Sequence, residues 1–164
     1  MRRHVLSVAL VLLSLASTPT TAALAPSKPS QLVAVGAFGL CTSLGLSTDL
    51  FNTRVNGDGT QVPFSIPAGE VLVITDLTVF GNGKTAGGMV FVELIVGTTA
   101  SSKTSILGAN VTADASGAFG FSATFPTGIV VKSGTSICPV AIDGASPTNV
   151  SATGSLHGFL TKDK

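Results

Sequence analysis

Two carboxylates, Asp76 and Glu93, interrupt otherwise apolar stretches of the chain, and paired carboxyl groups can act as acid and base in hydrolysis. We expect these stretches to form a hairpin through residues 81–87. If the register set Asp76 opposite Glu93, their side chains would lie within roughly 5 Å, near the separation found in retaining glycosidases. A slip of one residue would put them on opposite faces. The alternative is that each carboxylate lies at a sheet margin or faces water, where charge discourages aggregation.

Oxygen-bearing side chains also alternate with glycine at Asn56 and Asp58, in the segment 56–59. Together with backbone carbonyls they could hold a loosely bound calcium ion. The alternating oxygen ligands and distant Glu of a helix-loop-helix calcium loop are absent, and a turn explains both residues. We therefore predict no metal centre and no cofactor, and keep Asn56, Asp58, Asp76 and Glu93 as the candidate ligand residues.

Other catalytic signatures are missing. Gly83-Lys84-Thr85 ends like a phosphate-binding loop, but Thr78 stands where a second glycine is required and a strand is expected to follow. His157 is the only histidine beyond the leader, and no Gly-x-Ser-x-Gly elbow accompanies it. The sequence therefore predicts a protein that is not an enzyme.

The first 23 residues have the pattern of a secretory signal peptide, with a basic front, an apolar stretch and small residues before Ala23. The apolar stretch is too short to remain as a membrane span, and the mature chain is expected to have none. Residues 24–30 form a polar leader with two prolines, and residues 31–164 are expected to be one domain. The predicted location is secreted or periplasmic.

Charge is scarce in the mature chain. Once Arg2 and Arg3 are set aside, the nine basic side chains fall to seven, against eight acidic ones. Nucleic acid and anionic membranes are therefore poor candidate partners. A surface of Ser, Thr, Asn and Gly repels copies of itself only weakly, which favours close packing between copies.

Cys41 and Cys138 are the only cysteines. In an exported protein they are expected to form a disulfide, because the compartment is oxidising. The alternative, a free catalytic thiol, has no signature around either residue.

Apolar residues recur with a period of two, in short runs broken by Gly, Pro, Asn or Asp, and we find no convincing helix. This pattern predicts an all-β fold, an antiparallel β-sandwich of jelly-roll type with about eight to ten strands. Two turns, 67–69 and 126–128, are each expected to feed an inner strand, as in the two halves of a jelly roll. The predicted strands are 32–38, 44–50, 61–66, 71–80, 89–96, 105–112, 118–125, 129–131, 136–142 and 149–160.

Three functions remain open. The first is a non-catalytic exported sandwich that acts through its surface, by self-association as a homotrimer or fibre or by adhesion to an extracellular partner. The second is a small ligand- or carbohydrate-binding module that uses loops at one end of the sandwich. The chain has no Trp and no Tyr, so a flat aromatic sugar platform is not expected. The third is a hydrolase using Asp76 and Glu93.

Overall fold

A computed structural model describes residues 26, 28–82, 85–144, 149–150 and 152–164. Over these residues the chain forms strands and short 3-10 turns, with no α-helix. The predicted signal peptide, 1–23, lies outside them, as do residues 24, 25 and 27 of the leader. The elements are η1 Pro29–Gln31, β1 Leu32–Leu40, η2 Thr42–Leu44, β2 Asp49–Val55, β3 Gln61–Pro63, β4 Glu70–Asn82, β5 Met89–Gly97, η3 Ala100–Ser102, β6 Thr104–Thr112, β7 Ala118–Lys132, β8 Ser136–Asp143, β9 Asn149–Val150 and β10 Ala152–Lys162.

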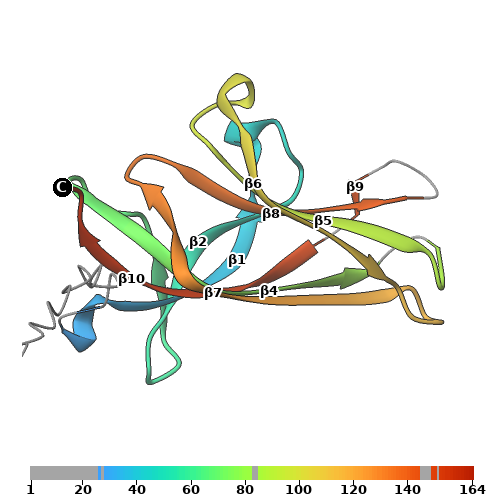
Figure 1. Ribbon diagram of the computed structural model, residues 1–164, viewed down its shortest axis with the longest axis horizontal. Helices are drawn as coiled ribbons and strands as arrows, with labels where there is room; N and C mark the ends of the chain where they lie inside the picture. The colour runs from blue at the N-terminus through green and yellow to red at the C-terminus, as the bar shows by residue number, and fades with distance from the viewer. Residues whose placement is uncertain (1–25, 27, 83–84, 145–148, 151) are drawn as a thin grey trace, which may run out of the picture.

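The strands form two antiparallel sheets that pack face to face, which confirms the predicted β-sandwich (Figure 1). The larger sheet has the order β3-β2-β1-β10-β4-β7, and the smaller has the order β6-β5-β8-β9. Figure 1 shows β4, β7 and β10 in one layer and β5 and β8 in the other. No described helix is long and apolar enough to cross a membrane.

The strand pairs follow the jelly-roll scheme, in which a long antiparallel ribbon is rolled up so that distant segments become neighbours. The first strand, β1, pairs with the last, β10, while β4 pairs with β7 and β5 with β6. Two further strands, β2 and β8, are in contact although they belong to different sheets. Strands from both ends of the chain therefore build the centre of the larger sheet.

The core between the sheets is made by alternate residues of the central strands, because side chains in a strand point to opposite faces in turn. Val33, Val35 and Ala37 of β1 point inward, and so does Leu156 of β10. The other central contributions are Leu72, Ile74, Leu77 and Val79 of β4 and Val90, Val92 and Leu94 of β5. The intervening residues of β1, β10 and β4 must therefore face outward from the larger sheet.

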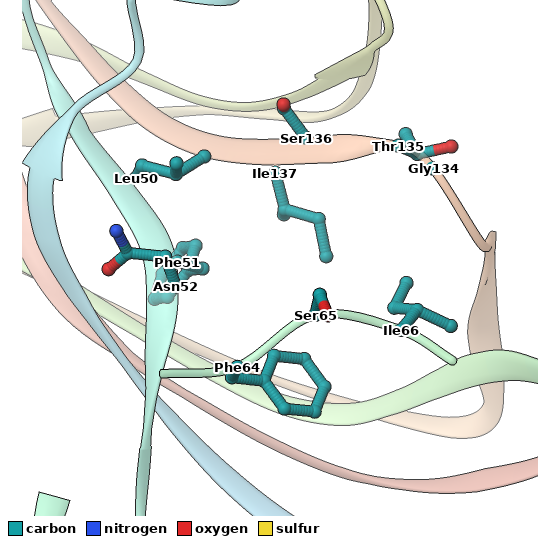
Figure 2. A pocket seen from close by; sticks show the side chains of 10 residues that line it. All are labelled: Leu50, Phe51, Asn52, Phe64, Ser65, Ile66, Gly134, Thr135, Ser136 and Ile137. Carbon is teal, nitrogen blue, oxygen red and sulfur yellow. The ribbon is translucent and has the colours of Figure 1, made fainter. Parts of the chain in front are cut away.

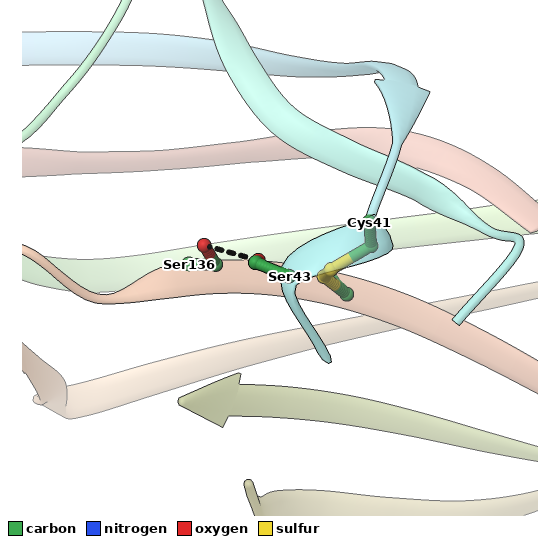
Figure 3. The surroundings of a disulfide bond; sticks show 4 residues. Cys41, Ser43 and Ser136 are labelled. Atoms are coloured by element: carbon green, nitrogen blue, oxygen red, sulfur yellow. Dashed lines mark hydrogen bonds between the residues drawn. A yellow bond between two sulfur atoms is a disulfide. The ribbon is translucent and has the colours of Figure 1, made fainter. Parts of the chain in front are cut away.

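A disulfide joins Cys41 to Cys138, the pairing expected from the sequence, with 6.3 Å between the Cα atoms. It fastens the segment between β1 and β2 to strand β8, as Figure 3 shows. Beside it the Ser43 and Ser136 hydroxyls are 3.0 Å apart and share a hydrogen bond. Leu44 of the same segment is buried against these sulfurs. The segment thus covers apolar residues of the smaller sheet.

The predicted strand 44–50 is wrong. Residues Thr42–Leu44 form a 3-10 turn, Gly45 has a φ of 66°, and β2 begins only at Asp49. The apolar alternation of Leu44 and Leu46 arises because both side chains pack into the cluster around the disulfide. Burial, and not strand pairing, produces that pattern.

The predicted turn at 126–128 is also wrong, because β7 runs continuously through it. The pairing with β4 shifts there, from Asp76 opposite Thr124 to Ile74 opposite Ile129, so the extra residues form a bulge. Gly128 supplies the positive φ, 73°. Because β7 is an edge strand, Pro126 is tolerated within it.

The expected hairpin between the strands of Asp76 and Glu93 does not form. Strand β4 lies in the larger sheet and β5 in the smaller one, so the connection crosses between the sheets. Residues 83 and 84 of that connection lie outside the described part of the chain. The predicted strand 61–66 is shorter than expected, ending at Pro63, and the predicted strand 149–160 divides into β9 and β10, with residue 151 not described.

Candidate functional site

The outward side of the larger sheet, which we call the outer face, carries four cross-strand rows. The pairing registers give three complete rows, each with one outward residue from β1, β10, β4 and β7 in turn: Leu32, Phe159, Val73 and Val130; Ala34, His157, Asp76 and Thr124; and Gly36, Ser155, Thr78 and Ser122. In the fourth row Thr153, Phe80 and Gly120 are paired. We place Phe38 at the β1 end of this row, because it is two residues beyond Gly36 and its ring lies over Gly36 on the same face. The first row is apolar, the next two are polar, and the last carries two aromatic rings.

Two phenyl rings are exposed on this face, which the sequence did not predict. Phe38 and Phe80 expose 49% and 50% of their surface. The Phe38 ring covers Gly36, where a Cβ would collide with it. Gly120, at the other end of the same row, has open space around the position of a Cβ. Phe38 on β1 and Gly120 on β7 therefore place a large and a small residue on opposite sides of the face.

A groove of about 650 Å³ indents the outer face beside β1. Its floor includes Ala34, Asp76 and His157, and Arg54 and Asn56 contribute to its lining from the β2–β3 hairpin. Figure 1 shows this hairpin projecting from the larger sheet on the side away from the smaller one. The groove thus brings together residues that are far apart in the sequence.

A bulge places Asp76 at the floor of this groove. The pairing of β10 with β4 skips Thr75, since His157 is opposite Asp76 and Gly158 is opposite Ile74. The Thr75 hydroxyl donates to Asp76 Oδ2 at 2.8 Å, and the Thr124 hydroxyl donates to Oδ1 at 3.1 Å. Two neutral donors, and no cation, hold this carboxylate among the described residues.

His157 and Arg54 supply the other polar groups of the groove. The imidazole of His157 has no hydrogen-bond partner among the described residues. The guanidinium of Arg54 donates to the Leu32 carbonyl oxygen at 3.2 Å and has no carboxylate partner in that part of the chain. The groove therefore offers a cation, a carboxylate and an imidazole beside the exposed apolar side chain of Leu32.

Asn56 and Asp58 belong to the turn between β2 and β3. Asp58 Oδ1 accepts from the Thr60 hydroxyl at 2.7 Å and from the Thr60 N–H at 2.9 Å, while Asn56 Nδ2 donates to the same hydroxyl at 2.9 Å. The two bonds from Thr60, of which the hydroxyl bond has the larger effect, lower the pKa of Asp58. Both side chains thus close the turn, and Asn56 also lines the groove.

Glu93 lies elsewhere. It belongs to β5 of the smaller sheet, half-buried, opposite Gly108 of β6 and Val140 of β8. It therefore cannot pair with Asp76 as acid and base. No group of three His, Cys, Asp or Glu side chains able to hold a metal ion occurs among the residues described.

The sequence indicated Asn56, Asp76 and His157 separately, but it did not predict that they lie in one groove with Arg54. Two irregularities of the fold bring these residues together, the bulge at Thr75 and the projection of the β2–β3 hairpin, and neither has a sequence signal of its own.

No protein-family model matches the chain, and no curated protein is significantly similar to it.

Proposed function

We propose that the protein is an exported, non-catalytic β-sandwich that acts by self-association through its outer face. The observation that supports this most strongly is the composition of the face. Among its sixteen row positions only Asp76 carries a full charge, and Leu32, Phe38, Phe80 and Val130 are each about half exposed. Exposed apolar side chains gathered on one sheet face are typical of an interaction surface.

The rows make this face complementary to itself. A two-fold axis parallel to the strands, midway between β10 and β4, sets each row against the same row of a second copy. Strand β1 then faces the second copy's β7, and β10 faces its β4. Two sheets packed in this way are nearly aligned, as in the interior of a sandwich.

The residues brought together by this axis suit one another. Phe38 would lie over the second copy's Gly120, where open space surrounds the Cβ position. Leu32 would meet Val130, so that apolar side chains bury each other. His157 would face the second copy's Asp76, an imidazole against a carboxylate that has no cation of its own. We propose this isologous dimer in place of the trimer or fibre expected from the sequence.

Export and the lack of catalysis are parts of the same proposal. A buried disulfide between Cys41 and Cys138 suits an oxidising compartment, as does the predicted signal peptide. Asp76 and Glu93 lie in different sheets, which removes the arrangement that favoured a hydrolase.

Sedimentation of the protein over a range of micromolar concentrations tests the proposal. The wild type is expected to form dimers, and Gly120→Arg is expected to weaken them at least tenfold, about 1.4 kcal/mol, by filling the space over which Phe38 packs. Gly120 is exposed with nothing near its Cβ position, so the variant should fold. Ser101→Arg, exposed on η3, adds the same charge away from the face and is the control. A monomeric wild type, or a Gly120→Arg dimer of unchanged affinity, would contradict the proposal.

The groove favours a second candidate function, the binding of a small polar ligand such as a sugar. Its cation, carboxylate and imidazole could each hydrogen-bond hydroxyl groups, and its volume of about 650 Å³ suits a small molecule. A glycan array distinguishes the two functions: binding that is lost in Asp76→Asn would support this candidate, and an array without binders would dispose of it.

A further inference from the structure

A separate cleft of about 250 Å³ opens on the side of the sandwich, where β2 and β8 approach each other from different sheets. Figure 2 shows Ile137 of β8 reaching across it toward Phe64 and Ser65 of the segment after β3. Phe51, Ile66 and Ile137 line it and are buried, so the cleft reaches the core. None of its lining residues belongs to the outer face.

Hydrogen bonds hold the walls of the cleft apart. The Phe64 N–H donates to the Asn52 carbonyl oxygen at 2.7 Å, which fixes this segment against β2. The Ser133 hydroxyl donates to the Ile66 carbonyl oxygen at 2.9 Å, which fixes its other end to the turn before β8. Because the segment is tied at both ends, it cannot collapse into the space without breaking one of these bonds.

The lining of the cleft carries no ionisable side chain: it consists of Leu50, Phe51, Asn52, Phe64, Ser65, Ile66, Gly134, Thr135, Ser136 and Ile137. A charged ligand would lose its hydration there and find no opposite charge, which is costly. The hydroxyl of Ser65 has no hydrogen-bond partner among the described residues, so it can bond a neutral polar group. The cleft therefore combines an apolar interior with uncharged hydrogen-bonding groups.

Size restricts the ligand further. An apolar cavity of about 150 Å³ is large enough for benzene. The cleft, at about 250 Å³, has room for a bicyclic ring or a short branched chain. We propose that it binds a small uncharged compound that has an apolar ring or chain and one hydrogen-bonding group.

Indole is a suitable probe, because the chain has no Trp or Tyr whose emission would overlap its fluorescence. We expect indole emission to shift to the blue in a saturable manner as protein is added. Tryptamine and indole-3-acetate keep the ring but add a positive or a negative charge, and each should bind at least about tenfold more weakly. Absence of saturable binding would overturn the proposal, and equal affinity for a charged analogue would overturn its claim about charge.

A matched pair of variants locates the binding. Ser65→Phe adds a ring at an exposed position of the lining and should weaken indole binding at least about tenfold, whereas Ser101→Phe on η3 should leave it unchanged. NMR of the wild type gives a second measurement that does not depend on folding of a variant: methyl shifts should concentrate at Ile66 and Ile137. Shifts concentrated elsewhere would contradict the assignment. Gly120→Arg should bind indole normally, because the cleft is independent of the proposed dimer.

Discussion

Removal of the Cys41–Cys138 disulfide should cost the protein a large part of its stability. The bond closes a loop with a sequence separation of 97 residues. In the chain-entropy model a loop of this length stabilises the folded state by about 4.7 kcal/mol, because it restricts the unfolded chain. Domains of ordinary size have about 5–15 kcal/mol of stability in total, so the reduced protein should be close to marginal.

Urea unfolding measures this effect. The protein is reduced while unfolded, because both sulfurs are fully buried in the folded state, and is then refolded with reductant present. With a slope of about 2 kcal/mol per molar urea, the midpoint should fall by about 2 M. The double variant Cys41→Ala, Cys138→Ala is the control, and its midpoint should not respond to reductant. A reduced wild type whose midpoint stays within about 0.3 M of the oxidised one would refute the loop-closure argument.

Further substitutions test the packing, the turns and one buried hydroxyl. Gly158→Ala should lower the free energy of unfolding by at least about 2 kcal/mol, because the added Cβ would collide with the Val73 carbonyl oxygen. Gly120→Ala, where the space is open, should change the free energy of unfolding by less than about 1 kcal/mol, and urea unfolding compares the two variants. Thr48→Val should raise the free energy of unfolding by about 1 kcal/mol, since the buried Thr48 hydroxyl has no hydrogen-bond partner among the described residues. An unchanged urea midpoint in Thr48→Val would contradict this expectation. Hydrogen bonds from the Ser116 hydroxyl and N–H lower the pKa of Asp114 from its ordinary 3.8, so its contribution to stability is present above that value and is lost as the pH falls below it. Thermal unfolding between pH 2 and 5 should therefore depend less on pH in Asp114→Asn than in the wild type.

The architecture could be predicted because burial of alternate residues leaves a direct pattern in the sequence. Stretches such as 71–80 and 89–96 alternate or are apolar throughout, and they became β4 and β5 with nearly the expected limits. Gly154 and Gly158 allow the backbones of β10 and β4 to approach closely, since a Cβ at either would collide with a carbonyl oxygen of β4. Two local predictions were wrong. At 44–50, side chains buried outside a sheet alternate like those of a strand, and at 126–128 a bulge within β7 has the residues of a turn.

The candidate site was harder to predict because it depends on which strands become neighbours. Consecutive strands usually pair, so the sequence favoured a hairpin that would join Asp76 to Glu93. In the jelly roll β4 pairs instead with β10 and β7, and His157 becomes the neighbour of Asp76. Arg54 reaches the same groove only because β2 lies at the side of β1. Such partners are separated by tens of residues, and local periodicity contains no information about them.

The two sheets differ in a way that explains why the outer face is available. On the smaller sheet, the segment that follows β1 is fastened by the disulfide and buries Leu44 and Leu46 against Ile95 and Val140. Among the described residues no equivalent segment covers the two polar rows of the larger sheet, where Thr78, Ser122 and His157 are exposed. A sheet face normally needs cover when it is apolar, and can remain open when hydroxyls dominate it. The outer face has two polar rows between an apolar row and a row with two aromatic rings. The protein can therefore keep this face open as a monomer, and the proposed dimer would bury the apolar side chains of its first and last rows.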